Sequence, residues 1–185
     1  HSFSDEQDIR SMGGVWKKIP FTYGLMLVGT LALTGFPFFS GFYSKEAIIE
    51  FAYLKGDTVG YFVAGVGIIT AVLTAIYSWR LIFKTFHGKY NNKNNNLSEI
   101  HESSLTMLIP CCLLAVGAIF AGILFKEIFI GSNSLDFWNN SILFLQTFQH
   151  GHLPTWIFII TPLIVILLIP ITYYFFVENE KILKN

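Results

Sequence analysis

The sequence is poor in charged residues. Asp, Glu, Lys and Arg make up 13% of its 185 residues, about half of the ~25% that an average soluble domain carries. Twelve Lys and Arg balance twelve Asp and Glu, so the chain lacks both the basic field that attracts nucleic acid and the acidic excess of many disordered tails. Hydrophobic residues reach 53%, and the mean hydropathy is +0.55. We therefore expect a lipid bilayer as the solvent and exclude nucleic acid as a partner.

Residues that carry cofactor or metal chemistry are also scarce. The two cysteines, Cys111 and Cys112, are adjacent within an apolar run, where a disulfide is geometrically unfavourable and further metal ligands are missing. The sequence contains no glycine-rich phosphate loop, nucleophile elbow or cysteine cluster. We therefore expect no catalytic residue, cofactor-binding residue or metal ligand in this chain.

Four stretches without Asp, Glu, Lys or Arg, at residues 19–44, 58–79, 103–125 and 153–177, are long enough for a membrane-crossing helix of about 20 residues. The predicted fold class is an all-α polytopic membrane protein with four transmembrane segments, the first of them discontinuous. The predicted organisation is an inner-side loop (1–18), a broken transmembrane helix (19–54), a transmembrane helix (58–79), an inner-side polar loop (80–102), a transmembrane helix (103–125), an outer-side loop (126–152), a transmembrane helix (153–177) and an inner-side tail (178–185).

The positions of Lys and Arg between these stretches predict the orientation, because cytoplasmic loops retain positive charge. Only Lys55 and Lys126 fall on one side of the four-span path. The opposite side, expected to face the cytoplasm or the mitochondrial matrix, carries Arg10, Lys17, Lys18, Arg80, Lys84, Lys89, Lys93, Lys181 and Lys184.

The first apolar stretch is too long for one straight crossing. Residues 20–54 would form a helix of roughly 52 Å at 1.5 Å per residue, whereas the hydrocarbon core is about 30 Å thick. Pro37 removes a backbone donor, and the glycines on either side of it are conformationally permissive. Unwound backbone at membrane depth is typical of ion pathways in transporters. We predict a helix break formed by Gly35, Pro37, Ser40 and Gly41.

Three ionisable residues, Lys45, Glu46 and Glu50, follow the predicted break. One interpretation places them at the outer interface, where their side chains extend toward water. The other keeps Lys45 inside the membrane, where a lysine deprived of water can exchange protons near neutral pH, as a proton relay must. We favour a relay of Lys45 and Glu46. Glu50, Arg80 and Tyr77 are candidate channel-lining residues, with an ordinary interfacial role as the alternative for the last two.

Three segments carry a family resemblance: EQDIRSMGG at residues 6–14, LTGFPFFSGFYSKEAI at 33–48 and IYSWRLIFKTFHG at 76–88. They closely resemble the antiporter-like subunit of respiratory complex I, called chain 5 in mitochondria and subunit L in the bacterial NADH-quinone oxidoreductase. The resemblance is strong over about the first 90 residues and loose afterwards. In that family a lysine followed by an acid lies on the discontinuous helix, which corresponds here to Lys45 and Glu46.

The resemblance implies a proton-translocating subunit of the membrane arm of the complex. Flavin and iron-sulfur clusters are then expected in partner subunits, with NADH and quinone as substrates of the whole complex and protons as the transported ion. The other membrane-arm subunits are the expected partners, in the bacterial or mitochondrial inner membrane. The family's other intramembrane lysines, glutamates and histidines have no counterpart in this chain, which is expected to hold only part of the proton path.

Two other interpretations remain open. The related subunit of a multi-subunit sodium/proton antiporter would use the same lysine on the same broken helix. Alternatively, the chain is a membrane fragment without a transport role. Because the sequence begins at His1 rather than at a methionine, we interpret it as a fragment or split product.

Overall fold

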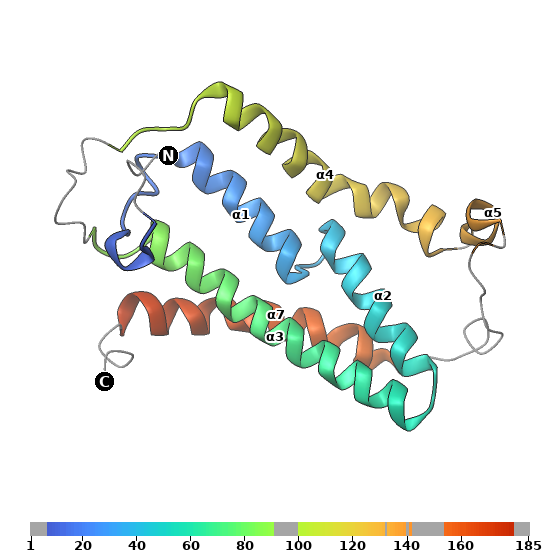
Figure 1. Ribbon diagram of the computed structural model, residues 1–185. Helices are drawn as coiled ribbons and strands as arrows, with labels where there is room; N and C mark the ends of the chain where they lie inside the picture. The colour runs from blue at the N-terminus through green and yellow to red at the C-terminus, as the bar shows by residue number, and fades with distance from the viewer. Residues whose placement is uncertain (1–6, 91–99, 132, 140, 142–153, 180–185) are drawn as a thin grey trace.

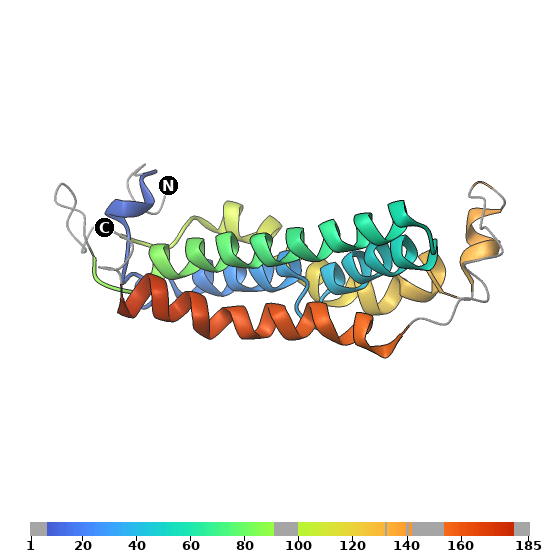
Figure 2. The ribbon, with the colours of Figure 1, turned by 90° about the horizontal axis from the view of Figure 1, so that it is seen from below.

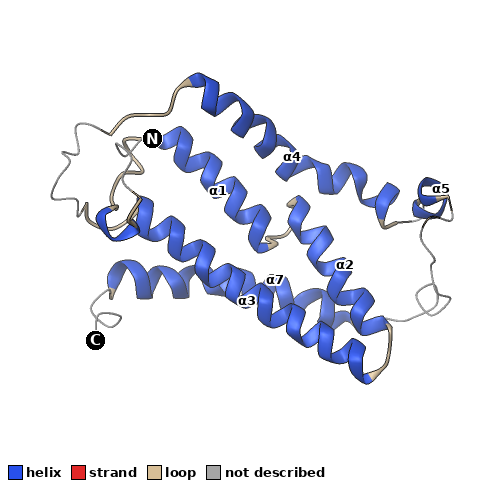
Figure 3. Cartoon of the chain, in the orientation of Figure 1, coloured by secondary structure: helices blue, strands red, loops and turns tan. Residues whose placement is uncertain are grey.

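The described residues, 7–90, 100–131, 133–139, 141 and 154–179 of a computed structural model, consist of helices and the turns that join them (Figure 3). The all-α prediction is confirmed. Parts of the predicted loops and tail, at 1–6, 91–99, 142–152 and 180–185, lie outside the described residues.

The long helices lie side by side. Figure 1 shows α4 (Leu105–Phe129), the consecutive helices α1 (Pro20–Thr34) and α2 (Ser40–Leu54), and α3 (Thr58–Phe86) next to one another, while α7 (Thr155–Tyr173) passes behind α3. In the view of Figure 2, α7 covers one side of this layer. The short elements are a 3₁₀ turn (η1, Ile9–Ser11), α5 (Ser134–Trp138) and a π-helical turn that continues α7 (η3, Tyr174–Glu178).

Among the described residues, three helices are long and apolar enough to cross a membrane: Thr58–Phe86, Leu105–Phe129 and Thr155–Glu178. Residues 19–54 instead form two helices of 15 residues each, shorter than the roughly 20 residues that one crossing requires. Three of the four predicted spans are thus single helices of sufficient length. We call the end of the bundle that carries the start of α1 and the end of α3 the inner end, and the end at the α2–α3 turn the outer end.

Two helices extend beyond the uncharged stretches from which they were predicted. Helix α3 continues past Trp79 to Phe86, so the first part of the predicted loop 80–102 is helical. Helix α4 continues through Lys126 to Phe129, into the predicted outer-side loop 126–152. An uncharged stretch indicates only which residues can lie in the hydrocarbon core. A helix can extend beyond it into a polar environment, because Arg and Lys are good helix formers.

Helix α3 is the centre of the packing because it contacts α1, α2 and α7. At the inner end, Trp79, Ile82 and Phe86 form a buried cluster with Ile19 and Val165. At the outer end, Ile49, Ala64 and Ile157 form a second one. The interruption between α1 and α2 lies between these clusters, about midway along the bundle (Figure 1).

Candidate functional site

The interruption between α1 and α2 is built from local backbone geometry. Gly35 adopts the left-handed conformation, with φ 79° and ψ 37°, and its N–H donates to the carbonyl of Ala32. The N–H of Phe36 donates to the carbonyl of Leu31 at 3.0 Å, which together is the usual glycine-terminated helix end. Phe38 also has a positive φ, 73°, so the chain changes direction before α2 begins at Ser40.

The end of α1 and the start of α2 approach each other closely at Gly41. A Cβ at this position would lie 2.9 Å from the carbonyl carbon of Ala32 and would overlap its oxygen. Only a residue without a side chain fits there. Gly41 thus brings α2 within reach of the last turn of α1.

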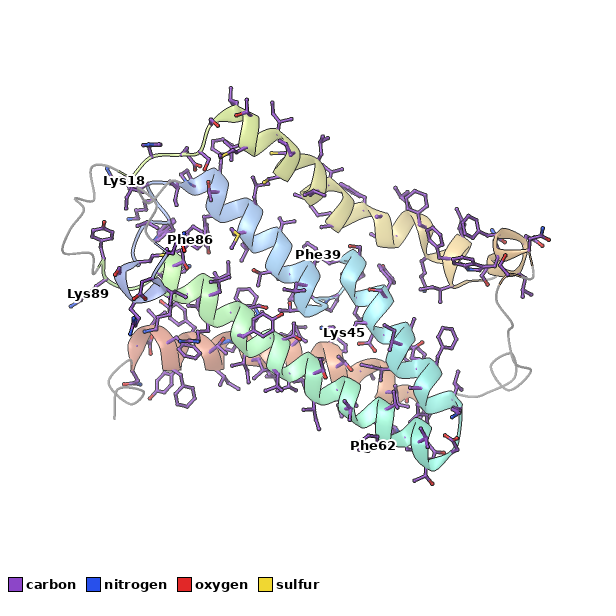
Figure 4. The ribbon with its side chains drawn as sticks, in the orientation of Figure 1. Lys18, Phe39, Lys45, Phe62, Phe86 and Lys89 are labelled. Atoms are coloured by element: carbon purple, nitrogen blue, oxygen red, sulfur yellow. The ribbon has the colours of Figure 1, made fainter. Side chains whose placement is uncertain are left out.

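Because the two helix ends are close, the Lys45 side chain of α2 reaches the last carbonyls of α1. Its ammonium group donates to the carbonyl oxygens of Leu33 at 3.3 Å and Thr34 at 3.2 Å. These belong to the last carbonyls of α1, which have no partner within the helix and lie at the negative end of its dipole. The backbone of Lys45 is near the positive end of α2, but its half-buried side chain returns to α1 (Figure 4).

Glu46 lies beside Lys45 on a different face of α2. Its side chain is 5% exposed, and its Oε2 has no hydrogen-bond partner among the described residues. Thr161 of α7 is its polar neighbour and its hydroxyl acts on the Glu46 carboxylate, although the two groups form no hydrogen bond of ordinary geometry in the described part of the chain. Because buried polar atoms are nearly always paired, two such atoms together mark a place where a proton or a water molecule can be accommodated.

The remaining predicted residues divide into two groups. Glu50 lies one turn after Glu46, is half-buried, and carries a charge that acts on Glu46. Tyr77 and Arg80 do not join them, because Tyr77 is 54% exposed and the Arg80 guanidinium lies 5.9 Å from the ring of Phe176. The structure therefore brings Lys45, Glu46 and Glu50 together and leaves the two α3 residues on the outside of the described bundle.

A second polar feature holds the start of α1. Ile19 provides no side-chain cap for this helix, but the carboxylate of Glu102 accepts hydrogen bonds from the backbone N–H of Phe21 at 2.7 Å and of Thr22 at 3.3 Å. The Thr22 hydroxyl donates to the same carboxylate at 2.7 Å. A carboxylate at this position satisfies unpaired amides and interacts favourably with the helix dipole.

His87, directly after α3, is enclosed by aromatic rings at the inner end. The Tyr23 hydroxyl lies 3.1 Å from its Nε2, and Trp16 stacks on its ring at a centroid distance of 6.4 Å. Burial lowers the pKa of His87 below its usual 6.5, because desolvation disfavours the charged imidazolium. This group thus serves the packing of residues 14–23 against the end of α3.

Comparisons with known proteins support the resemblance drawn from the sequence. Residues 1–74 match the family described as "NADH:quinone oxidoreductase/Mrp antiporter, TM", and residues 77–137 match "NADH dehydrogenase subunit 5 C-terminus". The NADH-ubiquinone oxidoreductase chain 5 of Marchantia polymorpha is 46% identical over 145 residues, which is 78% of this chain and 22% of that protein. The chain 5 of Phytophthora infestans is 48% identical over 142 residues, 77% of this chain and 21% of that protein.

The chain belongs to the chain 5 family of respiratory complex I. It spans about a fifth of the length of the curated relatives that it matches. The chain 5 match extends to residue 137, well past the first 90 residues on which the resemblance was strong. Together with the three long apolar helices, it identifies an integral membrane protein.

Sequence reasoning missed three polar residues of this chain 5 member. Thr161 and Glu102 gave no signal, because the groups that they face are 80 or more positions away along the chain. Lys126 ends an uncharged stretch and was assigned to the outer-side loop, whereas it lies in α4 with its ammonium 5.6 Å from the centre of the Tyr43 ring. Only the tertiary fold brings these residues to their partners.

Proposed function

We propose that this chain is part of the proton-translocating membrane subunit of NADH-quinone oxidoreductase, and that Lys45 and Glu46 form a proton relay within it. The observation that carries the proposal is the ammonium of Lys45 on the free carbonyls of Leu33 and Thr34, with the buried carboxylate of Glu46 beside it. Charged groups inside an apolar bundle are expensive and are typical of ion pathways.

In this proposal residues 19–54 cross the membrane as one broken helix, which gives four spans together with α3, α4 and the helix of α7 and η3. The cytoplasm or matrix side then holds residues 1–18, the end of α3 with the rest of 80–102, and 178–185. The opposite side holds the end of α4 with the rest of 126–152. Membership of the chain 5 family and the position of the interruption about midway along the bundle support this arrangement.

The proposed mechanism has Lys45 accept a proton from the inner side and pass it toward Glu46. The carbonyls of α1 hold the amine in place in either protonation state, because both the ammonium and the neutral amine can donate a hydrogen bond. Glu46 has an unpartnered oxygen that can receive the proton between transport steps. Transport of one charge against 100 mV requires about 2.3 kcal/mol, which a modest electrostatic change at a site of low dielectric constant supplies.

Electron transfer from NADH to quinone belongs, in this proposal, to partner subunits that contain flavin and iron-sulfur clusters. The curated relatives are named NADH-ubiquinone oxidoreductase chain 5 and include that of the plant Arabidopsis thaliana, at 46% identity over 145 residues. These names favour a mitochondrial inner membrane as the location. The direct partners are neighbouring membrane-arm subunits and lipid.

Replacement of Lys45 with alanine in the intact, reconstituted complex tests the relay. We expect fewer protons pumped per NADH oxidised, because the variant lacks the amine that lies on the carbonyls of α1 and delivers the proton to Glu46. Lys55→Ala is the matched control, since Lys55 lies at the α2–α3 turn, 52% exposed and paired with Asp57 at 3.0 Å. An unchanged proton ratio in Lys45→Ala would refute the relay.

A second candidate function is that of a subunit of a multi-subunit sodium/proton antiporter. It is favoured by the description of the family that matches residues 1–74, which names Mrp antiporters as well. Purification of the native complex separates the two, because only the oxidoreductase contains flavin and iron-sulfur subunits and oxidises NADH. A fragment without transport activity would show neither NADH oxidation nor sodium-dependent proton movement.

A further inference from the structure

Helix α4 contacts the start of α2 through a glycine. A Cβ on Gly122 would lie 2.5 Å from Cδ2 of Tyr43 and 2.6 Å from Cα of Ser40. No other residue type fits without a shift of the α2 backbone. The contact therefore fixes the position of α4 along α2 at the point where the interruption ends.

This contact determines what the next turn of α4 faces. Helices α2 and α4 run in the same direction (Figure 1), so Lys126, four residues after Gly122, comes about one turn further along α2. Its ammonium lies over the ring of Tyr43, 5.6 Å from the centroid, a favourable cation–π distance. Apart from this contact the Lys126 side chain is exposed on the described bundle.

Glu50 lies two turns after Tyr43 on the same stripe of α2, because positions i and i+7 of a helix share one face. Glu46 lies one turn before Glu50, and such pairs are about 5–6 Å apart at Cβ. The charge of Lys126 acts on Glu50. One carboxylate of α2, Glu50, and one cation of α4, Lys126, are thus linked across the α2–α4 contact, while Glu46 lies one turn before Glu50, next to Thr161 of α7.

We propose that Lys126 is a positioning residue that directs the carboxylate of Glu50 toward the α2–α4 contact, so that a proton released by Glu46 passes to Glu50 and leaves there. The inference rests on the proposed function of Lys45 and Glu46. It assigns Lys126 an action through Glu50 and no direct contact with the transported proton. Its chemistry is a proton transfer between two carboxyl groups, in which one O–H bond breaks as the other forms.

The test measures protons pumped per NADH oxidised in the reconstituted complex. Lys126→Met is expected to lower the ratio severalfold, and Lys126→Arg is expected to restore it, because arginine retains both the charge and the contact with an aromatic ring. In a Glu50→Gln background, Lys126→Met should cause no further loss. A purely structural role of Lys126 predicts an additional loss in that background, and that result would overturn the inference.

Normalising to the flavin content of the assembled complex separates pumping from assembly. If Lys126→Met does not assemble, the charge is tested with Lys126→Gln, whose polar side chain retains most of the volume. If Lys126→Met or Lys126→Gln pumps with the wild-type proton ratio while Lys45→Ala shows a loss, the inference about Lys126 is wrong and the proposed function stands. If Lys45→Ala pumps normally, the proposed function itself fails.

Discussion

Replacement of Gly41 with alanine would test whether the close contact between α1 and α2 holds Lys45 in place. The added Cβ would lie 2.9 Å from the carbonyl carbon of Ala32 and overlap its oxygen, whereas ordinary contacts are 3.4–4 Å. Both are backbone atoms that cannot rotate away. The two helix ends must separate, and of the two hydrogen bonds from Lys45, to Leu33 at 3.3 Å and Thr34 at 3.2 Å, the longer one would be lost first.

The magnitude follows from three contributions. Overpacking costs about 1–3 kcal/mol, and the rigid backbone at Ala32 places Gly41→Ala near the upper limit. Loss of one hydrogen bond from the charged Lys45 adds about 1.5–3 kcal/mol. The greater helix propensity of alanine offsets about 1 kcal/mol of this. We expect a net destabilisation of about 4 kcal/mol, together with a lower proton-pumping ratio.

Unfolding of the complete protein in detergent, followed by tryptophan fluorescence, measures the first effect, and pumping in liposomes measures the second. Gly29→Ala is the matched control within α1, because a Cβ there would meet no atom within 4 Å. Its free energy of unfolding is expected to rise by up to about 1 kcal/mol, and its proton-pumping ratio is expected to be normal. If Gly41→Ala behaves like Gly29→Ala in both assays, the reasoning about the interruption is wrong.

Two further predictions concern the inner end. Glu102→Ala removes the acceptor for the amides of Phe21 and Thr22 and is expected to destabilise α1 by about 1–2 kcal/mol; faster hydrogen exchange at these two amides would show it, and an unchanged rate would contradict it. Because burial lowers the pKa of His87 below 6.5, its neutral form contributes stability that is complete above pH 6.5 and is lost as the pH falls through the lowered value. Thermal unfolding of His87→Asn should therefore depend less on pH on the acid side, and a curve parallel to that of the native protein would argue against it.

Features set by neighbours in the sequence were predictable. Gly35 and Pro37 lie where α1 ends and α2 has yet to begin, because left-handed backbone and a missing donor are local properties of these residue types. The uncharged stretches likewise located α3, α4 and α7, since exclusion of charge from hydrocarbon acts residue by residue. Lys45 and Glu46 could be selected because their charges follow the interruption directly.

Partners across the fold were not predictable in the same way. The backbone of Lys45 lies near the positive end of α2, whereas its flexible side chain reaches the carbonyls of Leu33 and Thr34 at the negative end of α1. Arg80 and Tyr77 follow the polar pattern of a helix end but do not meet the other site residues. Which face of a helix is covered depends on the packing of its neighbours, and a single helix sequence does not contain that information.

The cap on α1 also has a consequence for folding during synthesis. The amide of Phe21 bonds to a carboxylate 81 positions later in the chain. During synthesis, therefore, the start of α1 exists long before the group that satisfies it, and its first amides must rely on water or headgroups until the beginning of α4 arrives. A break in the chain between α1 and Glu102 would place the helix and the residue that caps its first turn on separate polypeptides. The first turn of α1 is therefore fully hydrogen-bonded only once the segment that precedes α4 has packed against it, whether the two segments belong to one polypeptide or to two.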